Sequence, residues 1–225
     1  MNNTIRVGIV NADADITAGR KLVLESTGRI TLVLDEQKPE DLLDKFENYL
    51  IDVLLVDQRL RGMSGVELCE RLTKIKIEQG VETRLLVTAA FGSPRLTFDA
   101  LVAGANAVVT QDQGPKALIE TLYSLNSRKQ QQKFEQLKEL VADLDVDKKA
   151  DPVVQVLLES FDEFEKKLFA EIVSGNSIAS VSAANEVAGY RIRKIMQRAM
   201  DQLKVATLEQ LQLRLIQSGE DLGKN

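Results

Sequence analysis

Residues 53–65 read VLLVDQRLRGMSG, and this stretch decides the expected fold. Four apolar residues end in one carboxylate, Asp57. A short loop closed by Gly65 then leads into a segment whose apolar residues have helical spacing. A buried strand followed by a turn and a helix is the repeating unit of an open parallel sheet. Such sheets bind ligands at the carboxyl edge of their strands, so the sequence places Asp57 at a candidate site.

Residues 4–126 repeat this unit along the chain. The predicted strands are Ile5–Val10, Ile30–Leu34, Ile51–Val56, Arg84–Thr88 and Ala107–Thr110. The predicted helices are Ile16–Ser26, Glu40–Tyr49, Val66–Glu78, Pro94–Ala103 and Pro115–Asn126. These alternating segments predict an α/β domain with a doubly wound, five-stranded parallel sheet covered on both faces. The loops at the carboxyl edge are expected to bring together Asn11, Asp13, Asp57, Thr88 and Gln111.

The remaining sequence changes character. Residues 127–152 are rich in Gln, Lys, Glu and Asp and keep apolar residues at helical spacing, which predicts a charged helical linker. Asp151-Pro152 marks its end, because proline suits the first turn of a new helix. Residues 153–225 contain no convincing strand and predict a small all-α domain. Its expected helices are Val153–Val173, Ile178–Ala184, Tyr190–Leu203 and Leu208–Gln217.

The composition of the chain excludes several classes of function. The chain of 225 residues has a net charge of -5, one cysteine and no histidine. Without histidine there are no His-based catalytic triads and no His-ligated metals, and no nucleophile–base pair or glycine-rich phosphate loop is visible, so we do not expect an enzyme. Cys69 has no partner for an internal disulfide. With no signal peptide and no apolar run of membrane-spanning length, a cytoplasmic protein without membrane contact is expected.

The first domain resembles a response-regulator receiver domain of the NarL/FixJ type. The resemblance depends on the strand-end Asp57, the strand-end Thr88 and the pair Gly104-Ala105 before the fifth strand. It implies a flavodoxin-like receiver fold of residues 1–126, with Asp57 as the phospho-acceptor and Thr88 as the switch hydroxyl.

Several positions depart from that family. Its metal-binding acidic pair falls at Asn11 and Ala12, its lysine at Gln111 and its aromatic switch residue at Val108. Mg²⁺ prefers near-octahedral oxygen ligation, usually by carboxylates and water. The remaining candidate ligands are Asp57, Asp13 and the backbone of Arg59. We therefore expect an atypical receiver that needs no cofactor and is not phosphorylated in the usual Mg²⁺-dependent way. Conventional phosphorylation of Asp57 stays as the alternative.

A positive charge could replace the metal. One hypothesis is that Arg59 or Arg61 folds toward Asp57 and supplies that charge. The alternative is that both are solvated loop arginines.

The C-terminal domain carries a second motif. Residues 169–205 read FAEIVSGNSIASVSAANEVAGYRIRKIMQRAMDQLKV, with a short helix between Gly175 and Gly189 and a longer amphipathic helix after it. That spacing is typical of a helix-turn-helix. The apolar residues expected to face inward are Ile192, Ile195, Met196, Ala199 and Leu203. The cations gathered on the longer helix are Arg191, Arg193, Lys194 and Arg198.

This segment resembles the LuxR-type helix-turn-helix of NarL/FixJ regulators. The resemblance implies that Arg191, Arg193, Lys194 and Arg198 lie at or near DNA, and that the last helix helps to pair two subunits. Asn185 stands where the family has an apolar residue, and Ala188 where it has a capping serine, which predicts weakened or altered DNA binding. The alternative for the cations is the solvated face of a surface helix.

Together these patterns predict a DNA-binding transcriptional regulator. Its expected partners are double-stranded DNA, a sensor kinase or other regulatory protein, and a second copy of the chain. The alternative is an adaptor with decayed DNA binding that docks a kinase, another regulator or a polymerase subunit.

Overall fold

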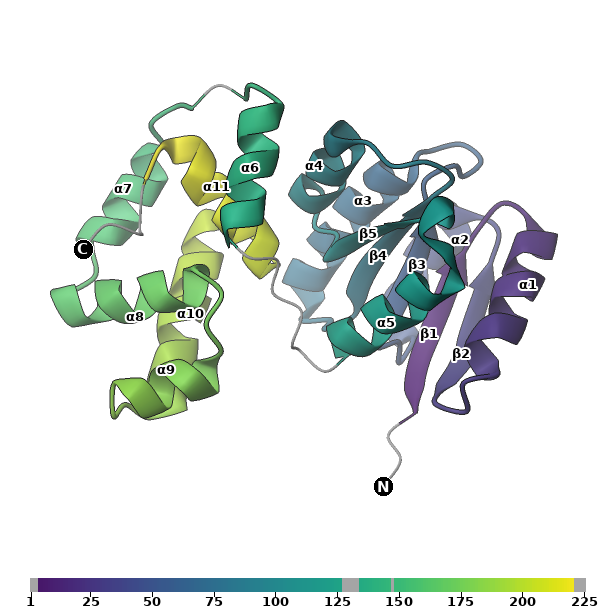
Figure 1. Cartoon of the computed structure of the whole chain (residues 1–225), viewed down its shortest axis with the longest axis horizontal. Helices are drawn as coiled ribbons and strands as arrows, with labels where there is room; N and C mark the ends of the chain where they lie inside the picture. The colour runs from purple at the N-terminus through teal and green to yellow at the C-terminus, as the bar shows by residue number, and fades with distance from the viewer. Residues whose placement is uncertain (1–3, 127–133, 147, 221–225) are drawn as a thin grey trace. The chain divides into compact units, whose positions relative to one another are not determined.

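The computed structural model describes residues 4–126, 134–146 and 148–220. The chain divides into two compact units, residues 1–130 and 131–225 (Figure 1). Part of the predicted linker, residues 127–133 and 147, lies outside the described residues. In the described residues, no helix has both the length and the hydropathy to cross a membrane.

The first unit contains one five-stranded sheet. Its strands are β1 (Ile5–Val10), β2 (Ile30–Glu36), β3 (Val53–Asp57), β4 (Arg84–Ala89) and β5 (Ala107–Thr110). All are parallel, in the order β2-β1-β3-β4-β5, which confirms the predicted doubly wound sheet. The register pairs Asp57 of β3 with Thr88 of β4, so both polar residues stand at the carboxyl edge.

Five α-helices cover the two faces of this sheet. They are α1 (Ala14–Glu25), α2 (Pro39–Leu43), α3 (Gly65–Gln79), α4 (Pro94–Val102) and α5 (Gly114–Asn126), with 3₁₀ turns η1 (Phe46–Asn48) and η2 (Gln111–Gln113). The single helix predicted over residues 40–49 is wrong. Lys45 leaves the helical conformation at φ -132°, and the chain restarts as η1. Leu42 and Phe46, on either side of the break, are both buried in the same core, so tertiary packing sets the chain path here.

The sheet separates two hydrophobic cores. Leu54 and Val56 face the core under α2, α3 and α4, whereas Val53 and Leu55 face the core under α1 and α5. This alternation is the period of two expected of a strand buried on both faces. Cys69 of α3 belongs to the first core, and burial raises the pKa of its thiol to about 12, so its role is structural.

The second unit is helical. Its helices are α6 (Phe134–Asp143), α7 (Pro152–Glu159), α8 (Glu163–Val173), α9 (Ile178–Ala184), α10 (Gly189–Leu203) and α11 (Leu208–Ser218). The prediction of one helix over residues 153–173 is wrong, because Asp162 is extended and accepts a hydrogen bond from the Glu165 N–H at 2.7 Å, which caps α8. Helix α6 packs against α11 within this unit, with Leu137 and Val141 buried.

One ion pair joins the start of α7 to α11. The Asp151 carboxylate accepts a hydrogen bond from Nε of Arg214 at 2.8 Å and also caps α7 by accepting from the Val153 N–H. The hydrogen bond from Arg214 is the main reason why the pKa of Asp151 is lowered below its usual value.

We expect Asp151→Asn to lower the free energy of unfolding by at most about 1 kcal/mol at pH 7, because both side chains are partly exposed. Since the folded pKa of Asp151 is lowered, its contribution is fully present above the unfolded pKa and disappears as the pH falls through the folded pKa. Urea unfolding followed by circular dichroism at pH 7 and at progressively lower pH measures the difference. If the difference in free energy of unfolding between the unaltered chain and Asp151→Asn stayed constant at acid pH, this assignment would be contradicted.

Candidate functional site

The Asp57 carboxylate is held by four hydrogen-bond donors. Its Oδ2 accepts from Asn11 Nδ2 at 3.1 Å, Arg20 Nη2 at 3.2 Å and Thr88 Oγ1 at 3.3 Å. Its Oδ1 accepts from the backbone N–H of Arg59 at 3.0 Å. The carboxyl ends of β1, β3 and β4 thus converge as predicted, and helix α1 adds Arg20.

Gly65 allows this arrangement. A Cβ atom at this position would lie 2.4 Å from the carbonyl oxygen of Asp57 and 2.9 Å from the Cα of Gln58. Real Cβ atoms do not approach backbone atoms so closely, so any side chain would displace the end of β3. The glycine at the start of α3 therefore lets the loop after Asp57 fold tightly against the strand.

Arg20 supplies the positive charge beside Asp57. Its side chain is 12% exposed and that of Asp57 is 11% exposed, so the ion pair is largely withdrawn from solvent. Arg59 and Arg61 are exposed, and Arg59 contributes only its backbone N–H. The hypothesis that one of these loop arginines folds toward Asp57 is therefore wrong. The positive charge comes from Arg20 of α1.

The residues here do not fit a magnesium ion. The positions of the acidic pair hold an amide, Asn11, whose Nδ2 donates to Asp57, and the methyl group of Ala12. A cationic guanidinium lies 3.2 Å from Asp57 Oδ2, where it repels a divalent cation. Across the described residues, no cluster of three or more Asp, Glu or Cys side chains is arranged to hold a metal.

The other predicted site residues lie near the carboxyl edge of the sheet but make no hydrogen bond to Asp57 among the contacts described. Asp13 is exposed and caps α1 by accepting from the Asp15 and Ile16 N–H groups. Gln111 is exposed at the start of η2. Val108 is half-buried and packs against the core under α3 and α4.

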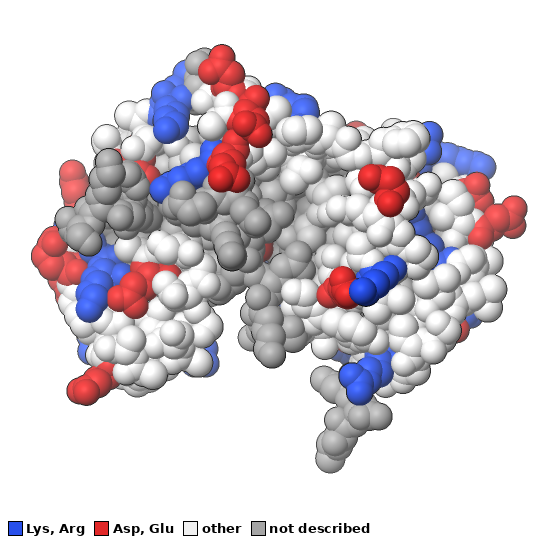
Figure 2. All heavy atoms as spheres, in the orientation of Figure 1, with Lys and Arg blue, Asp and Glu red and all other residues white. Residues whose placement is uncertain are grey.

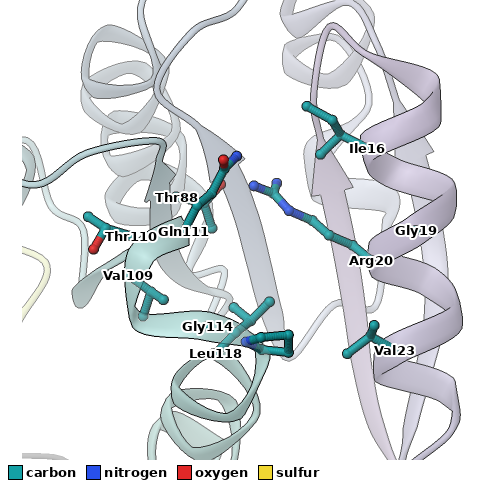
Figure 3. A pocket seen from close by; sticks show the side chains of 11 residues that line it. Ile16, Gly19, Arg20, Val23, Thr88, Val109, Thr110, Gln111, Gly114 and Leu118 are labelled. Atoms are coloured by element: carbon teal, nitrogen blue, oxygen red, sulfur yellow. The ribbon is translucent and has the colours of Figure 1, made fainter.

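A cavity of about 280 Å³ opens beside Arg20, between α1 and the segment from β5 to α5 (Figure 3). Figure 3 shows Arg20 and Gln111 pointing toward each other across it. Nη1 of Arg20 is buried and finds no hydrogen-bond acceptor among the described residues. The cavity is lined by Ile16, Gly19, Arg20, Val23, Thr88, Val109, Thr110, Gln111, Gly114, Pro115 and Leu118.

Sequence analysis missed Arg20, although a signal was present. Arg20 lies four residues after Ile16 and four before Leu24, which places it on the inward stripe of α1. Leu24 is fully buried and Ile16 is half-buried. A cation on the apolar stripe of a helix requires a partner, and Asp57 is that partner.

In the second unit, α10 presents cations to solvent. Its buried residues are the predicted ones, Ile192, Ile195, Met196, Ala199 and Leu203. Arg191, Arg193 and Lys194 are exposed near the start of the helix. On the face of the molecule seen in Figure 2, cationic and anionic side chains are interspersed.

Arg198 differs from its three neighbours. Its Nη2 donates to Glu165 Oε2 at 2.8 Å, and its guanidinium carbon lies 4.5 Å from the centre of the Phe161 ring. The cation therefore ties α10 to α8 and to the turn that precedes α8.

The two departures in the turn have structural counterparts. Asn185 Nδ2 donates to Glu171 Oε2 and to the Val181 carbonyl oxygen, both at 3.0 Å, which satisfies a polar group at a position expected to be apolar. Ala188 precedes α10 without a side-chain cap, as expected.

Comparison with known proteins agrees with this geometry. The family model of the response regulator receiver domain matches residues 7–123, more than half of the chain. The chain belongs to the response regulator receiver-domain family. The order of the strands and the aspartate and threonine at their carboxyl ends agree with that membership.

Curated relatives of this response regulator extend beyond the receiver. The probable transcriptional regulatory protein NarL of Mycobacterium tuberculosis is 24% identical over 185 residues, 81% of this chain and 80% of that protein. The probable transcriptional regulatory protein SgaR of Hyphomicrobium methylovorum is 22% identical over 206 residues, 92% of this chain and 90% of that protein.

Solved structures show the fold of both units. The receiver domain of NarL from Mycobacterium tuberculosis covers 56% of this chain and 98% of its own, with a TM-score of 0.50 and 21% identity. The response regulator RcsB of Salmonella typhimurium covers 95% of this chain and 98% of its own, with a TM-score of 0.51 and 17% identity.

We expect a double-mutant cycle with Arg20→Met and Asp57→Asn to give a coupling energy of about 1–3 kcal/mol, because the pair is largely desolvated. The exposed pair Arg71–Glu67 on α3 is the control, with an expected coupling below about 0.5 kcal/mol. Urea unfolding of the two sets of variants measures both energies. Equal couplings for the two pairs would show that Arg20 does not stabilise Asp57.

Proposed function

We propose that this response regulator is a DNA-binding transcriptional regulator whose receiver is not phosphorylated in the usual Mg²⁺-dependent way. The observation that carries the proposal is the Arg20–Asp57 ion pair, at the position where the family places a metal beside its phospho-acceptor. The domains proposed for these roles are residues 1–126 as the receiver, 127–152 as the linker and 153–225 as the DNA-binding domain. We propose a cytoplasmic, non-enzymatic protein.

The Asp57 carboxylate is a poor phosphoryl acceptor in this setting. Three donors already occupy the region of Oδ2, so this oxygen is shielded from an incoming phosphoryl group. A phosphoryl group would add negative charge where the family supplies Mg²⁺ and a lysine, whereas this chain has Ala12 and Gln111. Losing such electrostatic stabilisation typically costs several kcal/mol of transition-state stabilisation per group.

DNA contact is proposed for the start of α10. Arg191, Arg193 and Lys194 are exposed there, and the first residues of a recognition helix are those that enter the major groove. Arginine side chains reach phosphates and guanine edges from such positions. Arg198 is proposed as a peripheral contact, because Glu165 and Phe161 already hold it. Both relatives are named as transcriptional regulatory proteins, which supports this role.

Two copies are proposed to act together on DNA, through α11 among other surfaces. Helix α6 packs against α11 in the second unit, so pairing through that helix would require α6 to move. A sensor kinase or another regulatory protein is a further proposed partner, which would bind the receiver.

We expect Arg191→Ala together with Arg193→Ala to weaken binding to random-sequence duplex DNA by at least about tenfold, because each arginine at such an interface typically contributes about 1–3 kcal/mol. The dependence of log affinity on log salt should become shallower by about 2, since each phosphate that is no longer neutralised reduces the slope by about 0.9. Fluorescence anisotropy over a range of salt concentrations measures both quantities.

The matched control is Lys74→Ala together with Lys116→Ala, which removes the same charge from exposed positions of the first unit. Its affinity should stay close to that of the unaltered chain. Negligible affinity of the unaltered chain for any duplex, or equal losses in the two double variants, would favour the adaptor alternative.

We expect no labelling of the full chain by radioactive acetyl phosphate and Mg²⁺. The positive control is a variant that restores the family's pattern, with Asn11→Asp, Ala12→Asp, Arg20→Gln and Gln111→Lys, and it should become labelled. Labelling of the unaltered chain that disappears in Asp57→Asn would overturn the proposal and establish conventional phosphorylation.

A further inference from the structure

The Arg20 guanidinium has one terminal nitrogen that is paired and one that has no hydrogen-bond partner among the described residues. Nη2 donates to Asp57, whereas Nη1 is buried without an acceptor among the described residues. A buried donor left unpaired destabilises the folded state, and more so when it is charged. The arrangement is fixed, because the same carboxylate that holds Arg20 is itself anchored by Asn11 and Thr88.

The surroundings of that unpaired nitrogen favour an anion. Arg20 is the only charged residue among the described residues that line the cavity, and Asp57, which pairs with Nη2, lies outside the lining. Gly114 and Pro115, at the N-terminal end of α5, form part of the wall. The N-terminal end of a helix carries partial positive charge, which adds to the preference for a negative group.

The rest of the cavity favours an apolar body. Ile16 and Val23 of α1 face Val109 and Leu118 across it (Figure 3), and Pro115 also lines it. The volume of about 280 Å³ is near the lower end of the range for small-molecule sites. An apolar wall with a few polar groups at one end is the usual design of such sites.

We propose that this cavity binds a small carboxylic acid with an apolar body, its carboxylate on the guanidinium of Arg20. A carboxylate matches the planar guanidinium and accepts charge-assisted hydrogen bonds from it. Asp57 and Asn11 do not line the cavity, so the ligand binds noncovalently beside Asp57 and not on it. Binding of the carboxylate requires only the first unit. A role for this ligand as a signal that controls DNA binding rests on the proposed function.

The test is an NMR titration of the ¹⁵N-labelled full chain with benzoate, octanoate and indole-3-acetate. The neutral controls are benzamide, octanamide and indole-3-acetamide, which keep the shape and remove the charge. At least one carboxylate should shift the amide signals of Gly19, Arg20, Gly114 and Leu118 saturably, with at least tenfold higher affinity than its amide. Affinity equal to that of the amide, or no saturable shift with any of the three carboxylates, would overturn the proposal.

Two variants distinguish loss of the binding site from loss of the folded structure. Arg20→Gln should weaken carboxylate binding at least tenfold. Gly19→Leu should block it by filling the cavity, and a Cβ at position 19 meets nothing within 4 Å, so this variant keeps the fold even if Arg20→Gln does not. Ala18→Leu adds the same bulk at an exposed position of α1 and should bind normally.

Binding unchanged by Gly19→Leu, or equally weakened by Gly19→Leu and Ala18→Leu, would show that the carboxylate binds elsewhere. Duplex affinity of the Arg191 and Arg193 double variant is measured without any carboxylate. Failure of the carboxylate proposal and failure of the proposed DNA binding are therefore distinguishable.

Discussion

The ion pair between Arg20 and Asp57 governs the carboxyl edge of the sheet. An ionised carboxylate so far withdrawn from water needs compensating positive charge, and here a side chain of the chain itself provides it. The amide of Asn11 and the hydroxyl of Thr88 complete the set of side-chain donors. The compensating charge is covalently part of α1, whereas a metal ion can dissociate from the chain.

The same arginine also lines the cavity beside α1. Its Nη2 donates to Asp57, whereas its Nη1 is buried without an acceptor among the described residues. The helix that compensates the carboxylate therefore also contributes the one charged residue among the described residues that line this largely apolar cavity.

In the second unit, the cations of α10 divide into two groups. Arg198 is engaged with Glu165 and Phe161 and stabilises the packing of α10 on α8. Arg191, Arg193 and Lys194 are exposed at the other end of the helix. Asn185 is accommodated by hydrogen bonds to Glu171 and to the Val181 carbonyl oxygen, so the polar residue in the turn does not disturb the helix pair.

The sequence by itself determined the strands, the parallel sheet, the buried stripe of α10 and the convergence of Asp57 with Asn11 and Thr88, because these follow from local periodicity and from the rule that parallel strands end at one edge. Only the tertiary structure decided that Arg20 is the partner of Asp57, because the point that a helix side chain reaches depends on how α1 packs against the sheet. The break at Lys45 and the engagement of Arg198 were decided in the same way, whereas the break at Asp162 follows from a local N-cap. These contacts depend on packing between elements that are distant in sequence, and the spacing of residues along one helix does not reveal that packing.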